Sequence, residues 1–180
     1  MWNLPTRLAA GAAICLAFVF CASAIQAANP ATIDVTVTIQ NLSISTTGPI
    51  TYGVVLVSTT TVSTGSSTVT NDGNTTETYD IKLTDPAGGW TAVSGAPGAE
   101  EYRLSAQFSS SQPTAVSFAA DHDLTTSDQT SSATIFAGNE TGLSVAASAT
   151  RSLWFKFESP TSTTVTTQQT ITVTLTAAAG

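Results

Sequence analysis

The chain has 180 residues, with twelve Asp and Glu against five Lys and Arg, so its formal net charge is −7 at pH 7. Nucleic acids and anionic membranes bind proteins through basic surfaces, so this acidic balance argues against both as partners. Only 9% of the residues are charged. Ser and Thr supply most of the polarity, at roughly three in ten residues, well above average usage. Because the branched Thr side chain fits a pleated sheet, the composition favours a β-rich protein.

The N-terminal segment has the three-part pattern of a secretory signal peptide. A short start with one positive charge precedes an apolar run at residues 8–20, and small residues follow, so cleavage is expected after Ala24 or Ala27. The apolar run is too short to span a bilayer comfortably, so no membrane insertion of the mature chain is expected. We therefore expect residues 1–27 to be a signal peptide and residues 28–180 to form a single domain, secreted to the cell surface or the extracellular space.

The sequence predicts no catalytic residues and no enzyme activity. Both cysteines, Cys15 and Cys21, lie in the predicted signal peptide, which leaves the mature chain without a thiol nucleophile, a disulfide or a cysteine-ligated metal. The one histidine, His122, lies between two aspartates, where we expect an exposed loop. No nucleophile signature accompanies it.

Apolar and polar residues alternate through most of the mature chain, which is the period of strands with one buried face. The first predicted strand is residues 33–39, with a bulge expected at Asn41, where the alternation changes parity. Turn residues follow at 71–74 (Asn-Asp-Gly-Asn) and at 85–89 (Asp-Pro-Ala-Gly-Gly). The other predicted strands are, in chain order, 52–57, 79–83, 102–108, 116–118, a short one at Ile135, 143–145, 153–157 and 170–177.

This pattern predicts an all-β fold, an immunoglobulin-like antiparallel β-sandwich. The residues expected in its core are Ile81, Leu83, Leu104, Phe108, Leu153, Phe155, Phe157, Ile171, Val173 and Leu175. Trp90, which follows two glycines, is expected to fill the core at the start of a strand.

One stretch of the chain has a spacing found in a known group of modules. The residues that carry it are Val69, Asn71, Gly73, Tyr79, Ile81, Leu83, Gly89 and Trp90. This V-x-N-x-G, Y-x-I-x-L and G-W series resembles bacterial extracellular immunoglobulin-like β-sandwich modules of the NEW3 and CARDB type. It covers about a quarter of the mature chain and consists of turn and core residues. The resemblance implies an extracellular β-sandwich without catalytic residues.

Two groups of residues are candidates for binding. Asp121, Asp123 and Asp128 are the densest carboxylates, and calcium prefers clustered oxygen ligands, so these three could form a metal site. No other cofactor is predicted. Trp154 has the opposite parity to the expected core residues around it, so it should point outward beside Lys156 and form a contact surface.

The function predicted from these features is a non-catalytic structural or adhesive module of the cell envelope or extracellular matrix. The alternative is a carbohydrate- or cell-wall-binding module that uses exposed aromatic side chains. The partner is accordingly a protein or a glycan at the cell surface. Residues 33–39 and 170–177 contain no Pro or Lys, so either strand could pair with another subunit if it lies at a sheet edge. The other possibility is that both strands lie inside one sandwich.

Overall fold

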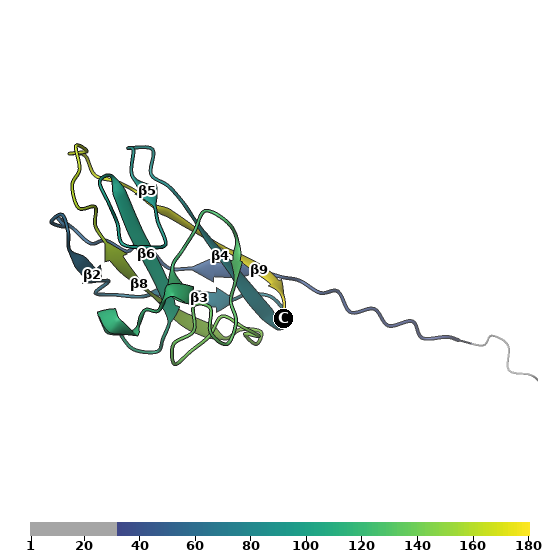
Figure 1. Cartoon of the computed structure of the whole chain (residues 1–180). Helices are drawn as coiled ribbons and strands as arrows, with labels where there is room; N and C mark the ends of the chain where they lie inside the picture. Colours follow the sequence, from purple (N-terminus) through teal and green to yellow (C-terminus); the bar gives the residue numbers. More distant parts are fainter. Residues whose placement is uncertain (1–31) are drawn as a thin grey trace, which may run out of the picture. The chain divides into compact units, whose positions relative to one another are not determined.

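The computed structural model describes residues 32–180 (Figure 1). The predicted signal peptide, its two cleavage sites and the predicted start of the domain lie outside these residues. The chain divides into two units, Met1–Val37 and Thr38–Gly180, and the second contains every strand that the described residues form. Among residues 32–180, no helix has the length and apolar character that a membrane span requires.

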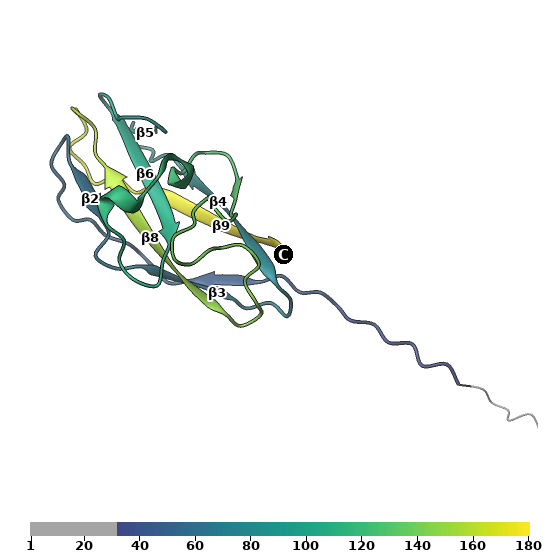
Figure 2. The same cartoon turned by 60° about the horizontal axis from the view of Figure 1, so that its bottom comes forward.

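The second unit is all-β and contains two sheets (Figures 1 and 2). The larger sheet is a curled half-barrel in the order β1-β3-β8-β6-β5, with β2 also paired to β8. Its pairs are antiparallel except for β5 with β6, which is parallel, so the sheet is mixed. Its strands are β1 (Ile44–Thr46), β2 (Thr60–Val62), β3 (Ser67–Asn71), β5 (Thr91–Ala92), β6 (Glu101–Phe108) and β8 (Thr150–Glu158).

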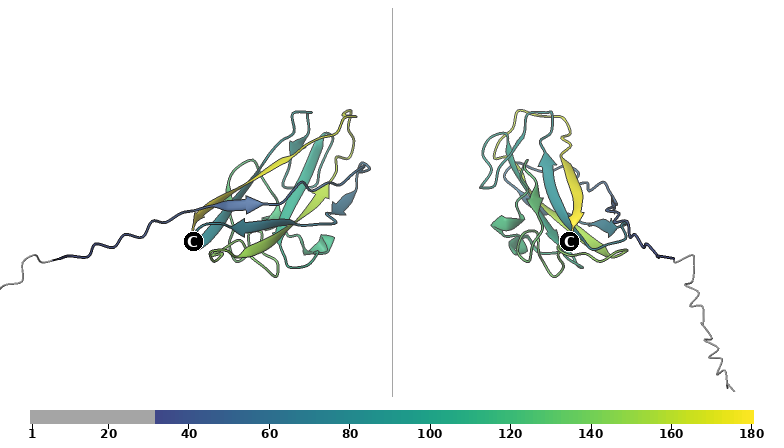
Figure 3. Two further views of the ribbon diagram at one scale, coloured as in Figure 1. Left: turned by 180° about the vertical axis from the view of Figure 1, so that it is seen from behind. Right: turned by 90° about the vertical axis from the view of Figure 1, so that its right-hand side faces the viewer.

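The smaller sheet has the order β7-β4-β9, and both of its pairs are antiparallel. Its strands are β4 (Glu77–Thr84), β7 (Gln129–Thr130) and β9 (Thr172–Ala179). The long pair β4 and β9 lies side by side, with β9 at the edge of the sheet (Figure 3). Two short 3-10 turns, η1 (Ala115–Ser117) and η2 (Ala120–His122), are the helical elements of the described residues.

The core lies between the two sheets and follows the alternation of the sequence. On β8, Leu153, Phe155 and Phe157 are buried, whereas Trp154 between them points to the other face. Trp90 packs against this core and stacks on Phe157 with the ring centroids 6.1 Å apart, as predicted. The predicted core residues that the structure buries are Ile81, Leu83, Leu104, Phe108, Leu153, Phe155 and Phe157. The other three, Ile171, Val173 and Leu175, are only partly buried because they belong to the end of the chain that forms the edge of the smaller sheet.

The predicted turn at residues 71–74 joins β3 to β4. The Asn71 side-chain oxygen accepts a hydrogen bond from the Gly73 N–H over 2.8 Å, the local bond that makes Asn a turn former. A side chain at Gly73 would collide with the carbonyl oxygen of Asn41 and with the carboxylate of Glu77. A glycine is therefore required here by close packing of the chain.

The first predicted strand is wrong. Residues 33–39 form no strand, and Ile33, Val35, Val37 and Ile39 are 87%, 81%, 79% and 77% exposed. The expected bulge at Asn41 is therefore absent too, and the first strand is the short β1. Alternation makes a segment suitable for a sheet, but a strand also needs a partner, and this run has none among the described residues. We call residues 33–39 the N-terminal run.

Four shorter predictions fail for a related reason. Residues 52–57 form no strand, although Tyr52 and Val55 pack on the core as irregular chain. Val116 and Ser117 belong to η1 in place of a strand, with Val116 exposed, and Phe118 follows the turn. Residues around Ile135 and 143–145 also form no strand, and Val145 is held by an isolated bridge to Glu77. In these segments a few apolar side chains reach the core without a continuous ladder.

Candidate functional site

A charged cluster is buried on the face of the larger sheet that points away from the core. The pairing of β6 with β8 sets Arg103 opposite Glu158 and Ser105 opposite Lys156. Because alternate residues share a face, all four side chains project to the same side. The segment with η1 and η2 lies over them and brings in Asp123, which forms a bridge with Ser105.

Two cations and two anions of this cluster neutralise each other. Glu158 receives hydrogen bonds from the Arg103 guanidinium, one of them over 2.9 Å, and its Oε1 lies 2.9 Å from the Lys156 ammonium. The Ser105 hydroxyl donates to Asp123 Oδ1 over 2.7 Å, and Asp123 Oδ2 lies 3.8 Å from Nη1 of Arg103. Every charge in the cluster therefore has an opposite charge beside it, as burial requires.

The two carboxylates of the cluster respond differently to burial. Burial raises the pKa of Asp123, and the hydrogen bond from Ser105 and the charges of Arg103 and Lys156 offset this only in part. For Glu158 burial also raises the pKa, but the hydrogen bonds and charges of Arg103 and Lys156 outweigh burial and leave the pKa below its ordinary value. Glu158 is therefore the ionised anchor of the two cations.

Lys156 does not belong to the contact surface predicted for it. Its side chain is buried, with the ammonium 5.6 Å from the centre of the Phe118 ring and bound to Glu158. Trp154 does point away from the core row, as predicted, but it is half-buried and its indole N–H donates to the carbonyl oxygen of Ser109 over 2.8 Å. The segment after β6 covers both residues. The side chains that point away from the core on β8 therefore pack under this segment.

His122 is buried, in contrast to the exposed position predicted from its aspartate neighbours. Its Nδ1 accepts a hydrogen bond from the Ala119 N–H over 3.1 Å, and its ring meets the Phe118 ring edge-on at 6.2 Å. These two contacts hold His122 within the packing of η2.

The three predicted calcium ligands are not brought together. Asp128 is exposed and pairs with Lys82 at 3.1 Å, Asp123 is buried against Arg103, and Asp121 lies near the ring of His122. Within residues 32–180, no three His, Cys, Asp or Glu side chains are placed to hold a metal ion. Two of the three carboxylates are already paired with a cation of the chain.

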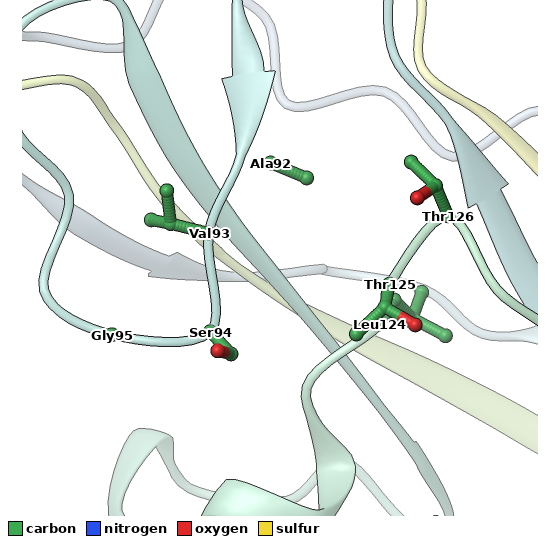
Figure 4. A pocket seen from close by; sticks show the side chains of 7 residues that line it. All are labelled: Ala92, Val93, Ser94, Gly95, Leu124, Thr125 and Thr126. Atoms are coloured by element: carbon green, nitrogen blue, oxygen red, sulfur yellow. The ribbon is translucent and has the colours of Figure 1, made fainter.

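Two of the hollows on the second unit have a defined lining. The first, about 350 Å³, lies between residues 92–95, at and after the end of β5, and residues 124–126 after η2 (Figure 4), and it is lined by apolar and hydroxyl side chains. The second, about 590 Å³, includes Asp85, whose carboxylate already accepts hydrogen bonds from the Ala92 N–H and the Tyr102 hydroxyl. The side-chain oxygen of Gln169, which also lines the second hollow, has no hydrogen-bond partner among the described residues.

Glu77 was not singled out by sequence reasoning, yet it is fully buried at the start of β4. Its Oε1 accepts a hydrogen bond from the Ser43 N–H over 2.7 Å, and its Oε2 has no hydrogen-bond partner in the described part of the chain. The alternation of the sequence indicates that Glu77 is buried, because it shares its parity with the core residues Tyr79 and Ile81. Glu77 holds the chain that enters β1.

The feature best placed for binding is the N-terminal run, because its four apolar side chains are exposed while its end is fixed. Asn74, in the turn between β3 and β4, accepts a hydrogen bond from the Asn41 N–H and donates one to the Ile39 carbonyl, each over 2.8 Å. The Asn74 N–H also donates to the Asn41 carbonyl over 3.2 Å. The run is therefore joined to the sheets at a defined point.

No protein-family model, no curated protein and no solved structure matches the chain.

Proposed function

We propose that the chain is a secreted, non-catalytic structural or adhesive module of the cell envelope or extracellular matrix. Its architecture is an immunoglobulin-like β-sandwich, and it acts through protein contacts. The signal-peptide pattern supports the location. The observation that carries the proposal is the N-terminal run, whose four aligned apolar side chains are exposed on an acidic, hydroxyl-rich protein. Exposed apolar surface of this kind is typical of an interaction site.

The placement of the charged groups supports a role without catalysis. Arg103, Lys156, Asp123 and Glu158 neutralise one another under the η1–η2 segment, and His122 closes that segment. These are the residue types that proton-transfer or nucleophilic chemistry uses. In this chain they stabilise the packing of a covering segment against the sheet.

Fractionation of cells that secrete the protein tests the proposal. The wild type should be found with the envelope or matrix. A variant with Ile33, Val35, Val37 and Ile39 all changed to Ser should be released into the medium with its circular dichroism spectrum unchanged. A matched control changes Thr36 and Thr38, on the polar side of the run, to Ser and should stay with the envelope. Release of the wild type, or retention of the apolar-to-Ser variant, would contradict the proposal.

A glycan array separates this function from the carbohydrate-binding alternative. A structural or adhesive module that acts through protein contacts should show no saturable binding to any glycan. Saturable binding that survives the four changes to Ser would assign the contact to another surface and favour the alternative.

A further inference from the structure

The N-terminal run has the side-chain pattern of a strand but no strand partner among residues 32–180. Its apolar side chains, Ile33, Val35, Val37 and Ile39, alternate with Asp34, Thr36 and Thr38. All seven residues are exposed. An extended segment with one apolar side is stable in water only when a sheet edge pairs with its backbone and a core covers that side.

The described residues offer one sheet edge that is long enough for the run. Strands β1, β2, β5 and β7 each have one paired side and contain three residues or fewer. Strand β9 has eight residues and lies beside β4, its one ladder partner among the described residues (Figure 3). Strand β1 also contacts β9, but no ladder joins these two strands. The edge carries no Pro, Lys or other charged residue that would discourage pairing.

The side chains of β9 match those of the run. Val173, Leu175 and Ala177 are half-buried and face the core, whereas Thr172, Thr174 and Thr176 face outward and are exposed. A strand added to this edge would place every second residue over the core side, beside Val173 and Leu175. The apolar side of the run would then extend the core, and its Thr residues would continue the outward Thr row of β9.

The direction of the chain at residues 39–46, within the second unit, favours the β9 edge of another molecule over that of its own. Asn74 holds Ile39 and Asn41 beside the turn, and β1 runs away from that turn along β3. Strand β9 ends at the same turn, since Ala179 is paired with Glu77. To lie along its own β9, the chain would have to reverse direction at the residues that Asn74 holds. A second molecule has no such restriction.

We propose that residues 33–39 of one molecule pair with the free edge of β9 in a second copy of this chain. Each copy carries one run and one β9 edge, so each molecule can donate a strand and accept one, and the contact can repeat from copy to copy. This inference rests on the proposed structural function and names its partner. The recognition is main-chain pairing along the edge, with alternate side chains setting the register.

Disulfide trapping between two single-cysteine proteins tests the contact. One protein carries Thr36→Cys and the other Thr172→Cys, Thr174→Cys or Thr176→Cys, all at outward positions, so the core is not disturbed. Mature secreted chains are used, and their mass is checked for loss of Cys15 and Cys21. Paired strands bring opposite Cα atoms to about 4.5–5.5 Å, which lies within the range a disulfide spans, about 4.4–6.8 Å. We expect a mixed disulfide with at least one of the three β9 variants.

The matched control is Thr130→Cys, an exposed position on β7 at the other edge of the same sheet. It should give at least tenfold less mixed disulfide with the Thr36→Cys protein than the best β9 variant gives. Equal yields at both edges, or no mixed disulfide with any β9 variant, would overturn the inference. A double variant that combines Thr36→Cys with Thr174→Cys in one chain tests the folded-back arrangement, and an internal disulfide there without mixed disulfides would also overturn it.

The fractionation and the trapping experiments fail independently. Release of the apolar-to-Ser variant without any mixed disulfide would leave the envelope function standing and reject the second copy as partner. Mixed disulfides between the single-cysteine variants, together with a wild-type protein that is found free in the medium, would keep the contact between copies and reject the envelope function.

Discussion

The side-chain amide of Asn74 donates a hydrogen bond to the carbonyl oxygen of Ile39 over 2.8 Å, which joins the exposed N-terminal run to the turn between β3 and β4. The same side chain accepts the Asn41 N–H, also over 2.8 Å. One residue thus fixes the point at which the run leaves the sheets. The course of the chain at Ile39 and Asn41 depends on a turn that is more than 30 residues away in the sequence.

Asn74→Ala should expose the Asn41 amide to exchange with solvent. The two side-chain bonds are exposed, so their loss should lower the free energy of unfolding by only about 1 kcal/mol. Amide hydrogen exchange measured by NMR should show lost protection at Asn41 and unchanged protection at Phe108, whose N–H bonds inside the unit. Asn139→Ala removes an equivalent pair of bonds to Ser110 and should leave Asn41 protected. Continued protection of Asn41 in Asn74→Ala would contradict the role of this side chain.

Gly73→Ala should destabilise the fold, whereas Gly65→Ala should not. A Cβ at Gly73 would meet the Asn41 carbonyl and the Glu77 carboxylate, so the entering chain or the turn has to shift, at a cost of about 1–3 kcal/mol. A Cβ at Gly65 would have no atom within 4 Å, so this change should be neutral or slightly stabilising. Urea unfolding of both variants measures the difference, and equal midpoints would refute the packing argument.

Phe157→Ala should lower the free energy of unfolding by about 3–5 kcal/mol, because it removes a large side chain at the centre of an aromatic group. The Phe157 ring lies 5.5 Å from that of Tyr52, 6.0 Å from that of Tyr102 and 6.1 Å from that of Trp90. Denaturant unfolding gives the free energy, and the fluorescence of Trp90 should also change in the folded state. Val116→Ala, at a 93% exposed position, is the control and should cost less than about 0.5 kcal/mol. A loss below about 1 kcal/mol for Phe157→Ala would place its face in solvent.

The fold should become less stable in acid, because the carboxylate of Glu158 becomes protonated there. Its pKa is lower in the folded than in the unfolded chain, because Arg103 and Lys156 outweigh the effect of burial. The carboxylate therefore stabilises the fold above the ordinary pKa of a glutamate, and this contribution is lost as the pH falls through the lowered pKa. Asp123, whose pKa burial raises, has the opposite dependence and offsets part of the loss.

Glu158→Gln should flatten the acid limb of stability against pH and cost about 1.5–3 kcal/mol at neutral pH, the range for a hydrogen bond to a charged group. Urea midpoints measured from acid to neutral pH test both effects. Asp34→Asn, which removes one exposed carboxylate outside the cluster, controls for the change in net charge. An acid limb that is unchanged in Glu158→Gln would mean that another group governs it.

The long strands could be predicted from sequence because their own alternation determines which face is buried. On β8, three apolar residues two positions apart can reach one core only if the intervening Trp154 and Lys156 face away, as observed. The turn at residues 71–74 was equally clear, because Asn and Gly have local conformational preferences. Local chemistry was sufficient in both cases.

Which strands pair with one another could not be predicted in the same way. The N-terminal run alternates as regularly as β8, yet β8 has β3, β2 and β6 beside it and the run has no neighbour in residues 32–180. Pairing depends on residues far away in the chain, and one sequence does not show which segments meet.

A residue that faces away from the core of a sheet is not necessarily exposed, and sequence alternation does not show the difference. Lys156 and His122 have the polarity of surface residues, but the segment after β6 folds over the outer face of the sheet and buries both. Each charge of the cluster has an opposite charge beside it, which offsets the cost of burying it under this segment. The composition shows four cations after the predicted signal peptide, but it does not show that two of them form an internal cluster.

The distribution of the basic residues has a consequence for proteolysis. Within residues 32–180 the four basic residues are Lys82, Arg103, Arg151 and Lys156, and each lies inside β4, β6 or β8. Trypsin cuts only after Lys and Arg, and it needs the chain extended and free in its active site. Every tryptic site in this part of the chain is therefore protected until a central strand separates from its sheet, so the rate of digestion reports on unfolding of the sheets themselves. Such a protein would persist among proteases of this specificity for as long as its strands stay paired.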